Sequence, residues 1–381
     1  LEALALDNQL EAKFATGWLQ HKVLAGVDYQ WSTADATYGN GTALTNPVNI
    51  SYLNPNYGSV REPALTNTIN QKRTQLGIYA QDQIRLANWA FVVGVRNDQA
   101  DATSDTRLLS TGALTNHATP SDSATTWRAG ATYLFENGLA PYFSYATSFE
   151  PTVGTDYTGQ AFAPTTGEQY EAGLKYQPLW INGFFMVSFF DLTQQNVLTP
   201  DTAHTAAGFP RCTASGPNCQ IQAGEVHSKG VELSAKLTPI AGLNLTASYS
   251  HTDIEITRST QISVQGKVPV GAPSDAGAFW VDYTFQSGPL AGFGLGGGVR
   301  YVGSSYGDNI NSAGMVVPAY TLYDAALHYD LAGMSPQLNG WKLALNVTNV
   351  FDMQYVSACN SATQCFWGNG RSILGTVRYQ W

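Results

Sequence analysis

Apolar and polar residues alternate along much of the chain. In residues 243–250 the odd-numbered positions are apolar and the even-numbered positions are small and polar, and residues 127–135 and 342–348 repeat this order. A period of two places the two sets of side chains on opposite faces of a β-strand. No comparable repeat occurs at helical spacing, so the pattern predicts an all-β chain.

The alternation predicts about fifteen strands separated by turns. Tight connections, such as 136–138 and 239–242, take turns with long ones, such as 36–71 and 198–224. Short turns at one end and long loops at the other are typical of a transmembrane antiparallel β-barrel. We expect the strands at 4–18, 22–35, 72–86, 89–106, 123–135, 139–149, 167–177, 184–197, 225–238, 242–256, 275–287, 293–305, 318–331, 340–350 and 369–381.

The composition agrees with strands that cross a membrane. Charged residues make up 12% of the 381 residues, whereas about 25% is usual for a soluble protein. No window approaches the roughly 18 unbroken apolar residues of a membrane helix, which excludes a helical membrane protein. The 19 basic and 28 acidic residues give a net charge of −9. This charge argues against a nucleic-acid groove, so nucleic acid is not an expected partner.

Aromatic residues mark the two expected membrane interfaces. Tyr133 and Phe135 come just before a tight turn, Tyr142 and Phe143 follow it, and Tyr249 lies toward the far end of its strand. An apolar strand face needs lipid or another apolar layer, whereas a polar face needs water. We therefore expect these five aromatics to belong to girdles on a lipid-facing surface, around a polar lumen.

Beyond Tyr249, three polar residues occupy the next positions that are expected to face outward. They are His251, Asp253 and Glu255. Lipid would not tolerate them at mid-depth, so we expect this strand to project above the membrane. A metal site formed by the same row is the alternative interpretation.

The four cysteines form two local pairs in polar, loop-like segments. Cys212 and Cys219 form one pair, and Cys359 and Cys365 form the other. We expect two disulfides on exposed loops and hence an oxidising compartment. A zinc site is the weaker alternative, because no CxxC motif or paired histidine lies nearby.

Two glycine motifs match enzyme signatures but lack the required context. Residues 292–297 match G-x-G-x-x-G, and residues 303–307 match G-x-S-x-G. Each signature requires a helix after the motif, whereas the first is expected to continue as a strand and the second as a loop. We therefore expect neither a dinucleotide site nor a nucleophilic serine, and no enzyme activity.

An expected count of about fifteen strands is odd, whereas bacterial single-chain barrels normally have an even number. We therefore expect residues 1–381 to be the C-terminal part of a larger barrel.

Eight short motifs follow one another along the chain: GVDY (26–29), GIYAQDQ (77–83), PYFSYATSFEP (141–151), EQYEAGLK (168–175), KGVEL (229–233), YVGSSYGD (301–308), NVTNVFD (346–352) and CFWG (365–368). Together they resemble the motifs of TonB-dependent siderophore receptors, most closely the ferrichrome/ferric-hydroxamate branch. The resemblance covers essentially the whole chain. It implies about 15 strands of a barrel of about 22, in the Gram-negative outer membrane, with an N-terminal plug and a TonB box that residues 1–381 lack.

The resemblance implies that the complete protein binds a ferric siderophore at its extracellular side and imports it by TonB-coupled transport. Iron would be carried within the siderophore, and no covalently bound cofactor or resident metal is expected. Implied partners are the TonB–ExbB–ExbD complex through the missing N-terminal part, lipopolysaccharide and outer-membrane lipid, the barrel-assembly machinery, and a phage or bacteriocin.

The resemblance also suggests ligand contacts. Tyr38 falls where the family has a ligand-facing loop aromatic, and Phe366 and Trp367 adjoin the second cysteine pair. Asn360 stands where ferrichrome receptors have an aromatic contact, which argues against ferrichrome itself.

The C-terminal strand alternates up to Tyr379 and Trp381. A terminal aromatic resembles the signal that the barrel-assembly machinery reads. We expect these two residues to serve as that signal.

A passive porin of about 16 strands is the alternative function, because its length would be similar. Such a porin predicts a closed, even barrel with a charged constriction loop. An outer-membrane enzyme would need a Ser/His/acid set, which the sequence does not offer.

Overall fold

A computed structural model of the chain describes residues 1–38, 64–205, 208, 214–215, 218–361 and 364–380. In this part of the chain, seventeen strands form one antiparallel sheet. Two of them, β5 (Leu114–Ala118) and β10 (Ala214–Ser215), are short additions. The other fifteen each have eight residues or more. The predicted all-β class and strand number are confirmed.

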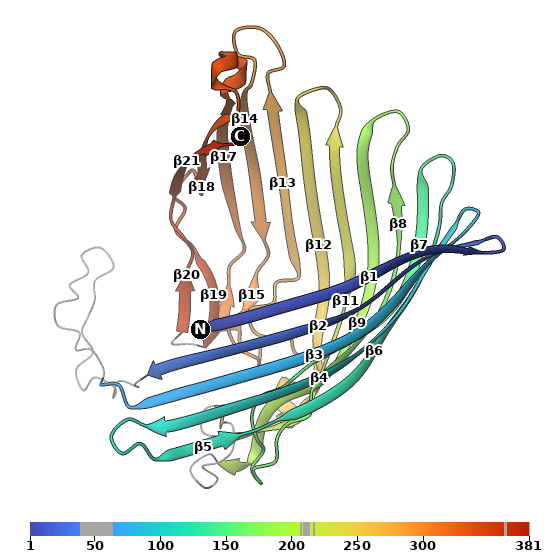
Figure 1. Cartoon of the computed structure of the whole chain (residues 1–381). Coiled ribbons are helices and arrows are strands. Elements are labelled where there is room, and N and C mark those ends of the chain that lie inside the picture. Colours follow the sequence, from blue (N-terminus) through green and yellow to red (C-terminus); the bar gives the residue numbers. More distant parts are fainter. Residues whose placement is uncertain (39–63, 206–207, 209–213, 216–217, 362–363, 381) are drawn as a thin grey trace.

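Each of the fifteen strands pairs with the next one along the chain, so the sheet is a meander. Figure 1 shows it as a strongly curved, open wall whose two edge strands are the first and the last. The strands are β1 (Glu2–Thr16), β2 (Leu19–Tyr38), β3 (Asn67–Leu86), β4 (Trp89–Leu108), β6 (Ser121–Tyr133), β7 (Leu139–Glu150), β8 (Thr165–Tyr176), β9 (Asn182–Thr205), β11 (Asn218–Thr238), β12 (Leu243–Arg258), β13 (Asp275–Thr284), β14 (Phe293–Val302), β17 (Tyr320–Asp330), β18 (Trp341–Thr348) and β21 (Ser372–Tyr379).

The remaining elements lie in the connections. Neither glycine motif is followed by an α-helix, as predicted, because residues 293–302 form β14 and Ser305 lies in a short strand. Among the described residues, no helix is long and apolar enough to cross a membrane. The short strands and 3-10 turns in the connections are β15 (Ser305–Tyr306) paired with β16 (Val316–Val317), β19 (Val356–Ser361) paired with β20 (Gln364–Trp367), and the 3-10 turns η2 (Ile262–Val264), η3 (Ala313–Met315), η4 (Leu331–Gly333) and η5 (Pro336–Leu338).

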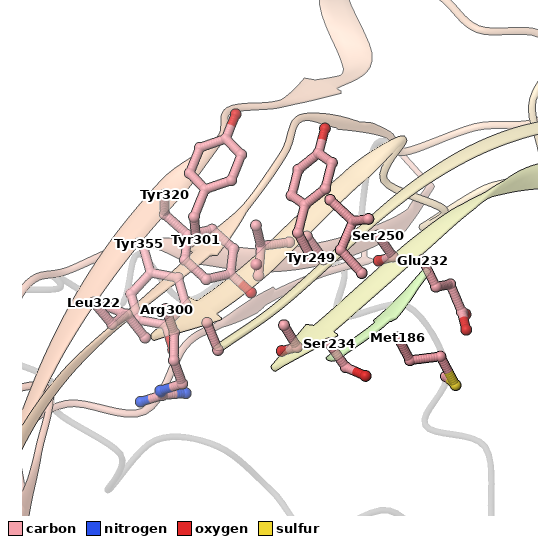
Figure 2. A pocket seen from close by; sticks show the side chains of 16 residues that line it. Met186, Glu232, Ser234, Tyr249, Ser250, Arg300, Tyr301, Tyr320, Leu322 and Tyr355 are labelled. Carbon is pink, nitrogen blue, oxygen red and sulfur yellow. The ribbon is translucent and has the colours of Figure 1, made fainter. Parts of the chain in front are cut away.

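The strand register gives the sheet two chemically different faces. Leu233 lies opposite Tyr249, which lies opposite Gly277 and, through it, Tyr301. We call this face, which carries exposed apolar side chains, the outer face. Figure 2 shows Tyr249 and Tyr301 pointing away from Arg300, which lies on the polar inner face. One apolar and one polar face is the arrangement that lipid outside and water inside require.

Aromatic contacts cross the outer face near both ends of the strands. At the short-turn end the ring of Tyr133 lies 4.9 Å from Trp89 and 4.6 Å from Phe135. Nearer the long connections, Tyr145 lies 4.6 Å from Trp127 and 4.7 Å from Tyr170. These two belts match the interfacial girdles of a membrane barrel.

Tyr142 does not belong to a girdle, so that prediction was wrong. Its hydroxyl donates to Glu171 Oε1 at 2.5 Å, on the inner face. The reason is the period of two, because neighbours in a strand point to opposite faces and Phe143 occupies the outer one. Phe143 and Tyr249 are exposed on the outer face, as predicted.

Ion pairs occupy the outer face above the second aromatic belt. His251 Nδ1 lies 2.8 Å from Asp275 Oδ1, and Lys229 Nζ lies 3.4 Å from Asp253 Oδ2. Paired charges on outward positions suit water or lipid headgroups rather than acyl chains. They support the prediction that β12 projects beyond the membrane.

The two faces predict opposite tolerance to charge at adjacent positions of β18. In the full-length protein, Leu345→Arg places a charge on the lipid face and should cost about 2–4 kcal/mol of folding free energy in a bilayer. Asn346→Arg, on the inner face, should fold like the wild type. Denaturant titration of the protein folded into lipid vesicles measures both, and equal destabilisation would contradict the assignment of faces.

Candidate functional site

A hollow of about 490 Å³ lies on the wall formed by β11 to β14 and β17 (Figure 2). Its inner-face floor consists of small side chains, because serine and alanine occupy the inward positions of three neighbouring strands. Longer side chains border it: Met186 and Glu232 on one side, and Arg300, Tyr320 and Tyr355 on the other. The volume is within the range of small-molecule sites. The floor residues are Ser234, Ser248, Ser250, Ala276 and Ala278.

Arg300 forms a two-point ion pair at the edge of the hollow. Its Nε donates to Asp324 Oδ2 at 2.5 Å, and its Nη2 donates to Asp324 Oδ1 at 2.9 Å. The Arg300 side chain is 48% exposed, whereas that of Asp324 is 13% exposed. Next to this pair the rings of Tyr320 and Tyr355 lie 4.3 Å apart. The hollow therefore has a cationic and aromatic border whose position is fixed by a mostly buried carboxylate.

Asn349 closes the neck of the connection between β18 and β21. Its Nδ2 donates to the carbonyls of Met353 at 2.9 Å and Asn369 at 3.1 Å, and its Oδ1 accepts from the Met353 N–H at 2.8 Å. The residue is only 3% exposed and has a φ of 52°. Asparagine tolerates this left-handed conformation better than most residues. One side chain thus holds both ends of the loop together.

A disulfide hairpin projects from this neck. The predicted Cys359–Cys365 disulfide is present and joins β19 to β20. Cys359 is buried, and a Cβ atom at Gly307 would come within 2.8 Å of its Cβ, so the hairpin packs closely against the β14–β17 connection. Phe366 is 54% exposed and Trp367 61% exposed. The hairpin is therefore held rigidly and presents two aromatic side chains.

The neighbouring connections are joined by side-chain hydrogen bonds. Asn311 bonds to Val268 twice, accepting from its N–H at 2.8 Å and donating to its carbonyl at 2.9 Å. Asp308 Oδ1 accepts from the Ser312 N–H at 2.9 Å. Hydrogen bonds from the Ser312 backbone and side chain lower the pKa of the Asp308 carboxyl. The connections 259–274 and 303–319 therefore form one ledge beside the hairpin.

A second polar cluster lies on the inner face of β2 and β4. Arg96 bridges two carboxylates, with Nη1 2.5 Å from Asp28 Oδ2 and Nη2 2.5 Å from Asp98 Oδ1. Gln75 Nε2 also donates to Asp98 at 2.9 Å. The inner face is thus polar far from the hollow as well.

The structure gathers some of the predicted site residues and separates others. Phe366 and Trp367 are neighbours on β20, and Asn360 lies in β19 of the same hairpin. Tyr38 is the last residue of β2, next to the opposite edge of the sheet. Tyr379 packs on Trp341 with ring centroids 4.9 Å apart. The ligand and assembly roles of these residues remain predictions.

Two predicted positions, Cys212 and Trp381, lie outside the described residues. Cys219 is buried and disulfide-bonded. Its pairing with Cys212 remains a prediction.

Sequence reasoning missed Arg300, Asp324, Asn349 and Tyr355. The alternation of β14 and β17 places Arg300 and Asp324 on the inner face, and this signal could have been read from the sequence. Asn349 lies within the NVTNVFD motif at 346–352. Its partners lie in other segments, so only the structure reveals its role.

A meander with an apolar outer face, a polar inner face and alternating short and long connections is the wall of an outer-membrane β-barrel. The match to known families agrees. The model of the TonB dependent receptor-like β-barrel matches residues 3–350, and the chain belongs to that family.

Curated relatives with similar sequences include receptors named for ferrichrome and ferrioxamine B. The chain is 37% identical over 393 residues to the ferrichrome outer membrane transporter/phage receptor of Escherichia coli (strain K12), covering 100% of this chain and 48% of that protein. It is 36% identical over 383 residues to the ferrioxamine B receptor of Salmonella typhimurium (strain SL1344), covering 100% and 50%. The chain thus spans about half the length of the curated relatives that it matches.

Solved structures share the fold. The closed form of the ferric-catecholate import receptor Fiu from Escherichia coli K12 superposes with a TM-score of 0.76 at 21% identity, covering 99% of this chain and 54% of that one. The siderophore receptor PiuA from Acinetobacter baumannii gives 0.75 at 21% identity, covering 99% and 56%.

The hairpin disulfide should order the loop more than it stabilises the barrel. It closes a sequence separation of only six residues, for which chain entropy gives about 2 kcal/mol. In the full-length protein, replacing both Cys359 and Cys365 by serine should therefore speed hydrogen exchange within 356–367 and leave exchange in the strands unchanged. Mass spectrometry of exchanged peptides measures this, and faster exchange throughout the sheet would contradict it.

Proposed function

We propose that the full-length protein containing this chain is a TonB-coupled receptor that binds a ferric siderophore of the hydroxamate type at its extracellular side and imports it. The observation that carries this proposal is the rigid disulfide hairpin, which presents Phe366 and Trp367 at the long-loop end of a polar-lined wall. Similarity over the whole chain to receptors named for ferrichrome and ferrioxamine supports the hydroxamate class.

The physical task of such a receptor is recognition without covalent chemistry. A ferric siderophore is bulky, and its metal is wrapped by the chelator, so iron is cargo rather than a resident cofactor. Tyrosine, phenylalanine and tryptophan offer large rigid contact areas, and tyrosine and tryptophan add a polar tip. A loop fixed before binding loses little entropy when the ligand arrives, which favours affinity.

The partners follow from the same proposal. Residues 1–381 would form the C-terminal part of the barrel, and TonB–ExbB–ExbD would act through a plug that lies outside this chain. The barrel-assembly machinery would insert the protein, and lipopolysaccharide would surround its outer rim. A bacteriocin is a further proposed partner, because the structure of FpvAI in complex with pyocin S2 has a similar fold, with a TM-score of 0.72.

Family membership favours this function over a passive porin. In the described part of the chain, the inner face also carries fixed ion pairs, such as Arg96 with Asp28 and Arg300 with Asp324. We therefore propose no second function for the wall.

Uptake of radiolabelled iron tests the proposal. The full-length gene, expressed in an iron-starved Gram-negative host that lacks its own hydroxamate receptors, should restore saturable uptake of ferric ferrichrome or ferric ferrioxamine B. Deleting tonB in that host should abolish this uptake, because transport is energy-coupled. Uptake that persists without TonB would indicate a porin, and absence of uptake of both chelates would refute the hydroxamate assignment.

A further inference from the structure

A continuous chain of hydrogen bonds links the hollow to the disulfide hairpin. Arg300, at the border of the hollow, holds Asp324 through two contacts. Asp324 Oδ1 also accepts the backbone N–H of Asn349 at 2.9 Å. The side chain of Asn349 then holds Met353 and Asn369, on the two sides of the loop neck. Three residues from three different segments therefore connect the wall to the base of the hairpin.

Further hydrogen bonds and close packing fix the base of the hairpin itself. Asp352 Oδ1 accepts the Arg371 N–H at 2.7 Å, which closes the neck a second time. The Gly368 N–H donates to the Tyr355 carbonyl at 2.8 Å. A Cβ atom at Gly368 would lie 1.9 Å from the ring of Tyr355, so only glycine fits against that ring. The direction of the hairpin is thus determined at its base.

Asp324 is the central residue of this series of hydrogen bonds, because it accepts from both Arg300 and Asn349. Its carboxylate is mostly buried, and it is satisfied by one guanidinium and one backbone N–H. Removing either donor would leave a poorly solvated charge, which is costly. The two donors come from the wall and from the loop neck, so the carboxylate favours the one arrangement in which both reach it.

We propose that Arg300, Asp324 and Asn349 act as one positioning unit that orients Phe366 and Trp367 for siderophore binding. The inference rests on the proposed function and names residues of the same site. Asp324 and Asn349 act only through the hairpin, so they are positioning residues, whereas Arg300 also borders the hollow. About half of the Arg300 side chain remains exposed at the hollow, where the oxygen acceptors of a bound chelate can reach its free N–H groups. A ligand that contacts Arg300 and the hairpin together would therefore stabilise the unit as a whole.

Siderophore binding by variants of the full-length receptor tests the unit. Asn349→Gly keeps the left-handed backbone accessible and removes only the side-chain hydrogen bonds. We expect it to raise the Kd and the transport KM about tenfold, because two aromatic side chains must then be immobilised on binding. The maximal uptake rate and the surface level should stay within about twofold of wild type, since the barrel is intact.

Asn311→Gly is the matched control. Asn311 also has a positive φ, of 57°, and also clamps a loop through its side chain, but it binds Val268 in the neighbouring ledge. This variant should bind siderophore like the wild type. A second variant, Asp324→Asn, should match Asn349→Gly, because a neutral amide has only one acceptor oxygen and cannot bind both Arg300 and the Asn349 N–H as the carboxylate does.

A double-mutant cycle separates positioning from general stability. If the unit acts through the hairpin aromatics, Asn349→Gly should cost little further affinity in a receptor that already carries Phe366→Ala and Trp367→Ala. Additive losses would overturn the proposal, as would wild-type affinity in both Asn349→Gly and Asp324→Asn.

Failure of the proposed function would look different, because the wild type itself would then bind neither ferrichrome nor ferrioxamine B. In that case hydrogen exchange tests the positioning unit without a ligand. Residues 353–369 should exchange faster in Asn349→Gly than in the wild type or in Asn311→Gly. Unchanged exchange would refute the unit.

Discussion

Backbone N–H and C=O groups inside a bilayer must find hydrogen-bond partners within the protein, and the rest of this structure depends on that constraint. The meander satisfies them by pairing each long strand with its neighbours, except along the outer edges of β1 and β21. Side chains are then free to differ between the faces, and the period of two separates them. Lipid-compatible residues such as Leu233 and Leu345 face outward, whereas Glu232 and Asn346 face a polar interior.

The same constraint explains where the rigid parts of the connections lie. A single curved sheet encloses no apolar interior of its own. Several of the buried apolar side chains therefore lie in or beside the connections at the long-loop end: Val264, Val317, Leu322 and Cys359. The hydrogen bonds of Asn349 fix the base of the disulfide hairpin at this end, outside the expected bilayer. Recognition can be built there because the membrane strands below it hold its base in place.

The sequence alone predicted all fifteen long strands, because alternation is a local property that adjacent residues display. The wrong assignment of Tyr142 came from reading an aromatic residue without asking which strand face its position occupies. The connection expected at 198–224 was too long, because β9 runs to Thr205 and β11 begins at Asn218. The positioning unit could not be predicted in the same way. Asn349 contacts Asp324 and Asn369, which are 25 and 20 residues away along the chain, and no periodicity encodes such contacts. The Cys359–Cys365 disulfide was predictable because its partners are close in sequence.

Solvent accessibility along β12 tests the central claim, that one lipid face and one polar face alternate up to a defined boundary. Nitroxide labels placed singly at residues 243–256 of the full-length receptor in lipid vesicles would report collisions with oxygen, which enriches in lipid, and with a water-soluble nickel chelate. We predict that oxygen dominates at odd positions up to 249 and nickel at even positions, with nickel dominating at every position from 251 onward. Accessibility without a period of two, or oxygen dominating at 251, 253 and 255, would contradict the account.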